Sequence, residues 1–122
     1  MQSTHNSNAF PKTRRLTLPS EFARVRIEGQ SLRGPLFVLA FLQHETTTPS
    51  RTGFVTSKRV GGAVVRNRIR RRLRSIVQTH QAKLRPGLWL VLIARPGASA
   101  ASFRALKDEW LRLAERASIL AP

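Results

Sequence analysis

The sequence predicts a mixed α/β fold, and three observations lead to that class. Two runs, Leu36–Leu42 and Leu88–Ala94, are apolar at every position, as strands are when both faces of a sheet are covered. Two longer stretches, near residues 63–80 and 103–117, repeat apolar residues every three or four positions, which is the helical period. Hydrophobic residues make up 41% of the 122-residue chain, which suffices for one core and one domain.

The chain begins with a polar stretch. Residues 1–13 have no hydrophobic period, so we expect a flexible N-terminal tail ahead of a single folded domain over residues 14–120. No apolar run reaches the roughly 20 residues that a membrane helix needs, and the chain has no cysteine. We therefore expect a soluble, cytoplasmic protein with no disulfide or thiolate metal site and no obligate protein partner.

The first helix is predicted after Pro19. Ser20 is the expected N-cap, because a serine hydroxyl accepts the amide hydrogens left free at a helix start. Gly29 is expected to end the helix. Its short apolar face is predicted to consist of Phe22, Val25 and Ile27.

Three strands are predicted from composition and flanking turns. Leu36–Leu42 is the first, and Thr52–Ser57, rich in β-branched and aromatic residues, is the second. The polar loop between them predicts that these two strands pair antiparallel. Leu88–Ala94 is the third, because a Pro-Gly pair lies on each side of it.

Two helices complete the predicted order α-β-β-α-β-α. The middle helix is expected to open at Gly62-Ala63 and to run to His80 or Ala82. Ser99 or Ser102 is the expected N-cap of the last helix. The apolar face of that helix is predicted to comprise Phe103, Leu106, Trp110, Leu113 and Ala117.

Charge is distributed unevenly along the chain. Twenty-two Lys and Arg against six Asp and Glu give a net charge of +16. From Thr46 to Lys107 there are fourteen Lys or Arg and no acidic residue. A polyanion relieves such an excess, so nucleic acid is the first partner to consider. The last helix carries three of the six acids, and we expect local pairs there, such as Asp108 with Arg112.

The middle helix concentrates the positive charge. At 100° per residue its apolar residues share one arc and its six arginines occupy the remainder. Like charges four residues apart, such as Arg66 and Arg70, repel each other in a free helix, and a phosphate backbone reverses that penalty. A solvated charged face is the alternative, but such faces usually mix both signs. The predicted RNA-binding residues are Lys58, Arg59, Arg66, Asn67, Arg68, Arg70, Arg71, Arg72 and Arg74.

Asn67 is the one uncharged polar residue inside the basic run 66–72. It either reads a base or sugar edge, or it caps the helix start and bonds to nearby backbone. Both interpretations stay open at this point. Gly61-Gly62, just before the helix, allows backbone amides to approach an anion.

Residues 51–74 carry a recognisable pattern. A strand ends in Ser-Lys-Arg, a glycine-bearing loop follows, and Arg-Asn-Arg opens a basic helix. This pattern resembles the protein subunit of bacterial ribonuclease P, and the similarity covers about residues 14–118. The matching positions are Ser57-Lys58-Arg59, Gly61, Ala63-Val64, Arg66-Asn67-Arg68 and Arg71 to Arg74.

Two positions depart from the family pattern. Arg26 stands one helical turn after Phe22, where the family often has an aromatic residue, and Gly62 replaces a frequent Asn in the loop. Arg26 either stacks on a base through its guanidinium plane or binds phosphate. The change at Gly62 is expected to alter loop geometry only.

The resemblance implies a two-layer α/β sandwich of the ribosomal-protein-like type, in the order α-β-β-α-β-α. It also implies a left-handed crossover between the parallel strands that flank the middle helix. Sheet geometry in general favours right-handed crossovers in about 98% of cases. We adopt the hand that the family implies.

The resemblance further implies a ribonucleoprotein endoribonuclease. Its RNA subunit cleaves with bound Mg²⁺, and its protein subunit binds that RNA and the 5′ leader of precursor tRNA. No catalytic residue and no metal ligand is expected in the protein, because the acid-free span offers no carboxylate. The three histidines, His5, His44 and His80, are scattered and have no orienting partner in sequence.

A groove for the single-stranded leader is expected between the first helix and the strands. Its candidate residues are Arg15, Phe22, Arg26, Phe37, Leu39, Phe54, Thr56 and Ser57. The other face of the first strand offers Val38 and Ala40 instead, and every apolar candidate also fits a plain core. The competing function is a non-catalytic RNA-binding protein such as a ribosomal component. A helix-turn-helix regulator fits poorly, because the element before the basic helix reads as a strand.

Overall fold

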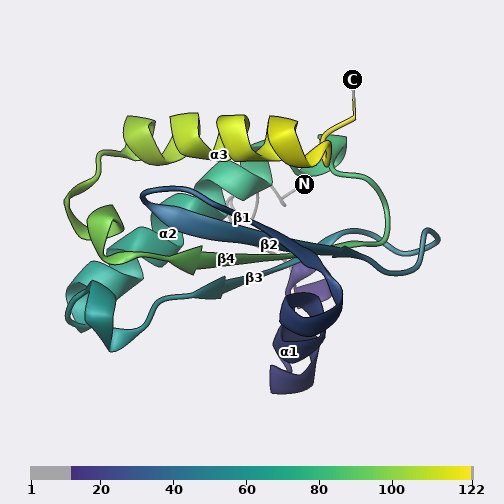
Figure 1. Cartoon of the computed structure of the whole chain (residues 1–122), viewed down its shortest axis with the longest axis horizontal. Helices are drawn as coiled ribbons and strands as arrows, with labels where there is room; N and C mark the ends of the chain where they lie inside the picture. Colours follow the sequence, from purple (N-terminus) through teal and green to yellow (C-terminus); the bar gives the residue numbers. More distant parts are fainter. Residues whose placement is uncertain (1–11, 122) are drawn as a thin grey trace, which may run out of the picture.

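The computed structural model describes residues 12–121, which form a four-stranded sheet with helices on both faces (Figure 1). The α-helices are α1 (Pro19–Glu28), α2 (Ala63–Thr79) and α3 (Phe103–Ala117). The strands are β1 (Gln30–Arg33), β2 (Phe37–Gln43), β3 (Arg51–Val55) and β4 (Leu88–Ala94). Short 3-10 turns are η2 (Lys12–Arg14), η3 (Lys58–Val60), η4 (Gln81–Lys83) and η5 (Pro96–Ala100).

The strand order is β1-β2-β4-β3. β2 pairs antiparallel with β1 and β4, and β3 pairs parallel with β4. The predicted antiparallel pairing of β2 with β3 is therefore wrong. β4 is the most completely buried strand and takes the place between them, where both of its edges are hydrogen-bonded.

Helix α2 is the crossover between the parallel neighbours β3 and β4, as the resemblance implies. The strand pairings do not decide the hand of this crossover, which stays a prediction. The bounds of α2, β4 and α3 agree with the sequence prediction, because long periodic or wholly apolar segments leave few alternatives. Of the two candidate caps of α3, Ser102 is the correct one: its hydroxyl accepts the Ala105 N–H at 3.0 Å.

Strand β1 is an edge strand that the sequence did not predict. Its residues are mostly exposed and show no apolar alternation. Gly29 joins it directly to α1, and the close packing there requires glycine. A Cβ at Gly29 would lie 2.2 Å from the Phe41 carbonyl oxygen.

The two faces of the sheet carry separate cores. Helices α2 and α3 cover one face, and α1 lies on the other (Figure 1). The larger core includes Phe37, Leu39, Leu73 and Trp110, each fully buried. Burial of side chains of this size contributes about 1.5–3 kcal/mol each. The smaller core, beneath α1, consists of Leu16, Val25, Ala40, Trp89 and Val91.

The start of α1 differs from the prediction. Leu18, not Ser20, is the N-cap, and Pro19 takes the first helical position. Glu21 Oε1 accepts the backbone N–H groups of Thr17 (2.9 Å) and Leu18 (3.0 Å), so no serine hydroxyl is needed. Ile27 is also misassigned, because it is 81% exposed.

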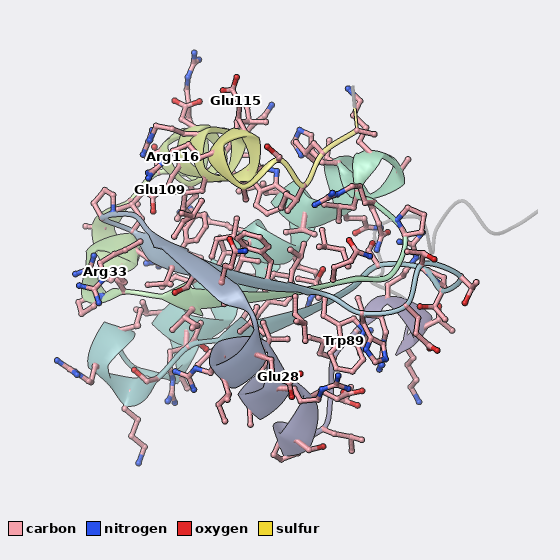
Figure 2. The ribbon with its side chains drawn as sticks, turned by 45° about the vertical axis from the view of Figure 1, so that its right-hand side comes forward. Glu28, Arg33, Trp89, Glu109, Glu115 and Arg116 are labelled. Carbon is pink, nitrogen blue, oxygen red and sulfur yellow. The ribbon has the colours of Figure 1, made fainter. Side chains whose placement is uncertain are left out.

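Helix α3 is attached to the β1–β2 connection by a buried carboxylate. Glu109 is 1% exposed, and its Oε2 accepts the N–H groups of Leu36 (2.9 Å) and Phe37 (2.8 Å). Figure 2 shows Glu109 on the side of α3 that faces this end of the sheet. Arg112 pairs with Glu109 at 3.4 Å rather than with the predicted Asp108.

The predicted tail lies almost wholly outside the described residues. Residues 12 and 13, which were assigned to it, form the start of η2. Arg14 Nη1 donates to Ser50 Oγ at 3.0 Å, and this bond holds η2 to the loop between β2 and β3. Within residues 12–121, no helix has both the length and the apolar character to cross a bilayer.

Candidate RNA-binding site

Helix α2 turns its apolar arc to the core and its arginines outward, as predicted. Its buried residues are Ile69, Leu73, Ile76 and Val77. The arginines then fall on two sides of that arc, because positions four apart stack along one side of a helix. We call Arg70 and Arg74 the β3 flank and Arg68 and Arg72 the α3 flank, after the elements that each pair approaches.

None of the α2 arginines forms an ion pair with a carboxylate within the described chain. The ion pairs found there are Arg24–Glu28, His44–Glu45, Arg51–Glu21, Arg104–Asp108 and Arg112–Glu109. Lys58 and Arg59, in η3 before the helix, are exposed. The positive charge of α2 is therefore not neutralised by the acids of residues 12–121.

Arg70 of the β3 flank is ordered by neutral partners. Arg70 Nη1 donates to Thr56 Oγ1 at 2.5 Å, and its Nη2 donates to Asn67 Oδ1. Asn67 lies in the second turn of α2, and Gly62 is the N-cap. The capping interpretation of Asn67 is therefore wrong. Its exposed side chain holds Arg70, and its contact with RNA stays a prediction.

A hollow of about 140 Å³ crosses the edge strand β3, between α1 and the β3 flank. We call it the β3 groove. Phe22 from α1 lies over Gly53 of β3, and a Cβ at Gly53 would come within 2.4 Å of the phenyl ring. The groove is lined by Arg15, Leu16, Phe22, Thr52, Gly53, Phe54, Arg70 and Arg74.

The β3 groove gathers positive charge. Burial lowers the pKa of Arg74, and the nearby guanidinium groups of Arg15 and Arg70 lower it further. Thr52 is 1% exposed, and its Oγ1 has no hydrogen-bond partner within the described chain. An anion in this groove would relieve the repulsion between the cations.

The predicted leader-groove residues are only partly brought together. Arg15, Phe22 and Phe54 line the β3 groove. Thr56 lies beside it through its bond to Arg70, and Ser57 is exposed at the end of the strand. Arg26 is exposed on α1, one turn after Phe22, and is not among the lining residues.

Phe37 and Leu39 do not line a groove, so their assignment is wrong. Both are 0% exposed in the core beneath α2 and α3. The pleat of β2 turns these odd positions to that core, and it turns Val38 and Ala40 to the face that α1 occupies. Of the alternative pair, Ala40 is buried in the smaller core and only Val38 is partly exposed, so a contact of this face with the leader stays a prediction.

Helix α1 leaves part of its own sheet face open. Val38 pairs with Ile93, and Val55 pairs with Ile93 from the other side, so the three form a strip across β2, β4 and β3. All three are half-buried. Sequence reasoning missed Val55 and Ile93, because wholly apolar runs carry no alternation that marks an accessible face.

The position of α1 depends on Arg51, another residue that sequence reasoning missed. Its Nη1 lies 2.8 Å from Glu21 Oε2, and its Nε and Nη2 donate to the Arg15 carbonyl at 3.1 and 2.7 Å. The Arg51 and Arg24 guanidinium carbons lie 5.7 and 5.6 Å from the ring centre of Trp89, which Figure 2 shows on the α1 side. These contacts fix Arg15 and Phe22 at the groove.

The same contacts set the ionisation of Glu21. Burial alone raises the pKa of this carboxyl group, but the hydrogen bonds from Leu18, Thr17 and Arg51 outweigh it. The net pKa is lower than the ordinary value. No group of three or more His, Asp or Glu side chains placed to hold a metal ion occurs within residues 12–121.

The basic helix and the Ser-Lys-Arg turn before it lie within a region that matches a known protein family. A family model described as Ribonuclease P matches residues 10–118. The chain belongs to the ribonuclease P protein family. The ribonuclease P protein component of Acidothermus cellulolyticus is 42% identical over 88% of this chain and 90% of its own length.

Solved structures of ribonuclease P proteins share the fold. The protein from Thermotoga maritima is 29% identical, with a TM-score of 0.74 over 84% of this chain and 96% of that one. The protein from Staphylococcus aureus has a TM-score of 0.81 over 89% and 99%, and its 24% identity bears on the fold alone. The α/β fold implied by the resemblance is confirmed.

Membership in this family also decides between the two functions considered. The chain is a protein subunit of ribonuclease P, part of an endoribonuclease complex that works with the ribonuclease P RNA. A ribosomal component is not favoured. The stretch 51–74 that carried the resemblance spans β3, η3 and the first three turns of α2.

Proposed function

We propose that α2 binds the catalytic RNA, that the β3 groove binds the 5′ leader of precursor tRNA, and that the RNA performs the cleavage. The observation that carries this proposal is the set of α2 arginines without a carboxylate partner in residues 12–121. Arginine suits this role because its planar fork donates two hydrogen bonds to one phosphate.

The β3 groove has the chemistry that a single strand requires. Phe22 offers a ring on which a base stacks, and Arg70 and Arg74 offer phosphate contacts along the same hollow. Phe54 also lines the groove, but it packs against the larger core on the other face of β3. The half-buried strip of Val38, Val55 and Ile93 extends this surface across the sheet. A paired stem would hide its base faces, so an unpaired leader is the fitting occupant.

Hydrolysis is assigned to the RNA, with Mg²⁺ held by RNA groups. Two-metal cleavage of a phosphodiester needs clustered carboxylates or phosphate ligands, and the span from Thr46 to Lys107 has no acid. His44 packs on Trp89 with ring centres 4.3 Å apart, and His80 Nδ1 lies 3.2 Å from Trp110 Nε1. We assign the complex to the cytoplasm and give the protein no obligate protein partner.

The test is cleavage of precursor tRNA by a bacterial ribonuclease P RNA at low Mg²⁺, with and without the protein. Added protein is expected to accelerate cleavage, because its arginines replace part of the cation screening that the RNAs need. Cleavage no faster than with RNA alone would contradict the proposal. A second arm compares binding of leader-bearing precursor with mature tRNA, and only the former is expected to gain affinity from the protein.

A further inference from the structure

The α3 flank of α2 borders a second pocket, on the side away from the β3 groove. Phe103, the first residue of α3, is 42% exposed although it belongs to the predicted buried face. It adjoins a shallow, open hollow of about 350 Å³. We call this hollow the Phe103 pocket, and it is lined by Arg68, Arg71, Arg72, Ser75 and Phe103.

The arginines of this pocket are held in place before any ligand binds. Arg68 Nη2 donates to the Ser99 carbonyl at 3.1 Å, and Arg72 Nη1 donates to the Ala101 carbonyl at 3.0 Å. Each bond uses one of the five N–H groups of a guanidinium, so donors remain for an anion. Because these side chains are already ordered, a ligand would lose less affinity to side-chain ordering.

The same short segment fixes the aromatic ring. Ser99 and Ala101 lie just before Phe103. Ser102, between Ala101 and Phe103, caps α3 by accepting the Ala105 N–H. Figure 1 shows this segment passing beside the first turns of α2. The ring and the guanidinium groups therefore belong to one rigid corner rather than to two mobile surfaces.

We propose that the Phe103 pocket binds one unpaired nucleotide of the catalytic RNA. Phe103 stacks on the base, and Arg68 and Arg72 contact the adjoining phosphates. This inference rests on the proposed binding of α2 to that RNA and adds a specific contact to it. An acidic peptide would satisfy the arginines, but an exposed ring among guanidinium groups matches a flat base joined to a phosphate.

The position of the pocket selects the catalytic RNA over the leader. The leader is assigned to the β3 groove, whose α2 residues are Arg70 and Arg74. The Phe103 pocket uses Arg68 and Arg72, on the other side of the buried arc. A strand that follows the β3 groove would have to cross α2 to reach Phe103.

The first experiment measures the affinity of the full-length protein for ribonuclease P RNA after Phe103→Leu and Phe103→Trp. Loss of base stacking is expected to weaken binding by about 5- to 100-fold in Phe103→Leu, and Phe103→Trp should keep wild-type affinity. The salt dependence should stay unchanged, because no charge is removed. Leu111→Ala, at another exposed apolar residue of α3, is the control and should bind like wild type.

The second experiment uses the tryptophan of Phe103→Trp as a probe, with the wild-type protein as the fluorescence blank for Trp89 and Trp110. Quenching on addition of ribonuclease P RNA supports the pocket. Quenching by leader-bearing precursor tRNA alone, or equally by polyglutamate, would overturn it. Unchanged RNA affinity in a folded Phe103→Leu that still accelerates cleavage would also overturn it and leave the proposed function standing. Failure of the wild-type protein to bind the RNA would instead remove the proposed function.

Discussion

The two flanks of α2 carry the same residue type but hold it in different ways. On the β3 flank, cations converge on a hollow, and their mutual repulsion adds to burial in lowering the pKa of Arg74. On the α3 flank, Arg68 and Arg72 are fixed by backbone carbonyls and border the exposed ring of Phe103. The difference shows that the position of an arginine around the helix, more than its presence in a basic run, determines which ligand it suits.

The largest effect is expected from Leu73→Ala, which removes a buried side chain that supports both flanks of α2. Leu73 is fully buried on the arc between the two flanks, so the cavity is expected to lower the free energy of unfolding by about 2–5 kcal/mol. Urea denaturation measures this loss. At temperatures where the variant stays folded, both flanks should lose affinity together. Loss of binding at one flank alone would mean that the helix does not position both.

Phe22→Ala separates the β3 groove from the rest of the RNA surface. Removal of the ring is expected to weaken binding of leader-bearing precursor by about 1–3 kcal/mol, the usual contribution of one stacked base. Binding of mature tRNA should change little in the same equilibrium assay. Ile27→Ala, an exposed apolar site on the same helix, is the matched control. Equal losses for both RNAs would show that Phe22 acts only as a core residue.

Paired substitutions sharpen the assignment of each flank. Arg68→Gln with Arg72→Gln should reduce the salt slope of catalytic-RNA binding by about one to two units, since each lost phosphate contact removes about 0.7–0.9. Arg70→Gln with Arg74→Gln should instead reduce the extra affinity for leader-bearing precursor. Titrations at several salt concentrations measure both effects. Identical profiles for the two double variants would remove the distinction between the flanks.

The smallest expected effect concerns pH and the attachment of α1. The pKa of Glu21 is lower in the folded protein than in the unfolded chain. Its contribution to stability is therefore present above the unfolded value of about 4.3 and is lost as the pH falls through the folded value. Glu21→Gln should flatten this part of the stability profile between pH 6 and 3 in urea denaturation. A pH profile of stability in Glu21→Gln that matches wild type over this range would contradict the assignment.

The elements that sequence predicts well are those with one strong local signal. α2 and α3 show the helical period, and β4 is apolar throughout, so their existence and bounds follow directly. β1 has no such signal, because its residues are polar and it depends on pairing with β2. The partner of β3 was also missed, since parallel pairing with β4 forms across the whole of α2.

The site shows the same limit. The arginines of α2 are predictable, because a run of one charge in a periodic helix has to face outward. Sequence does not predict which face of β2 a given residue occupies. Phe37 and Val38 are both apolar, and only the alternation of side chains along the strand puts them on opposite faces. Arg51 and Glu109 escape prediction since their partners lie far away in sequence.

The central claim is that the arginines of α2 find their anions on the ribonuclease P RNA. The most direct test is the salt dependence of that binding in wild type and in a variant with the four α2 arginines outside the β3 groove, Arg66, Arg68, Arg71 and Arg72, all changed to Gln. Wild type should lose affinity steeply between 50 and 200 mM salt, and four lost phosphate contacts should reduce the slope by about three units. A wild-type slope near zero, or the same slope in the folded variant, would contradict the account.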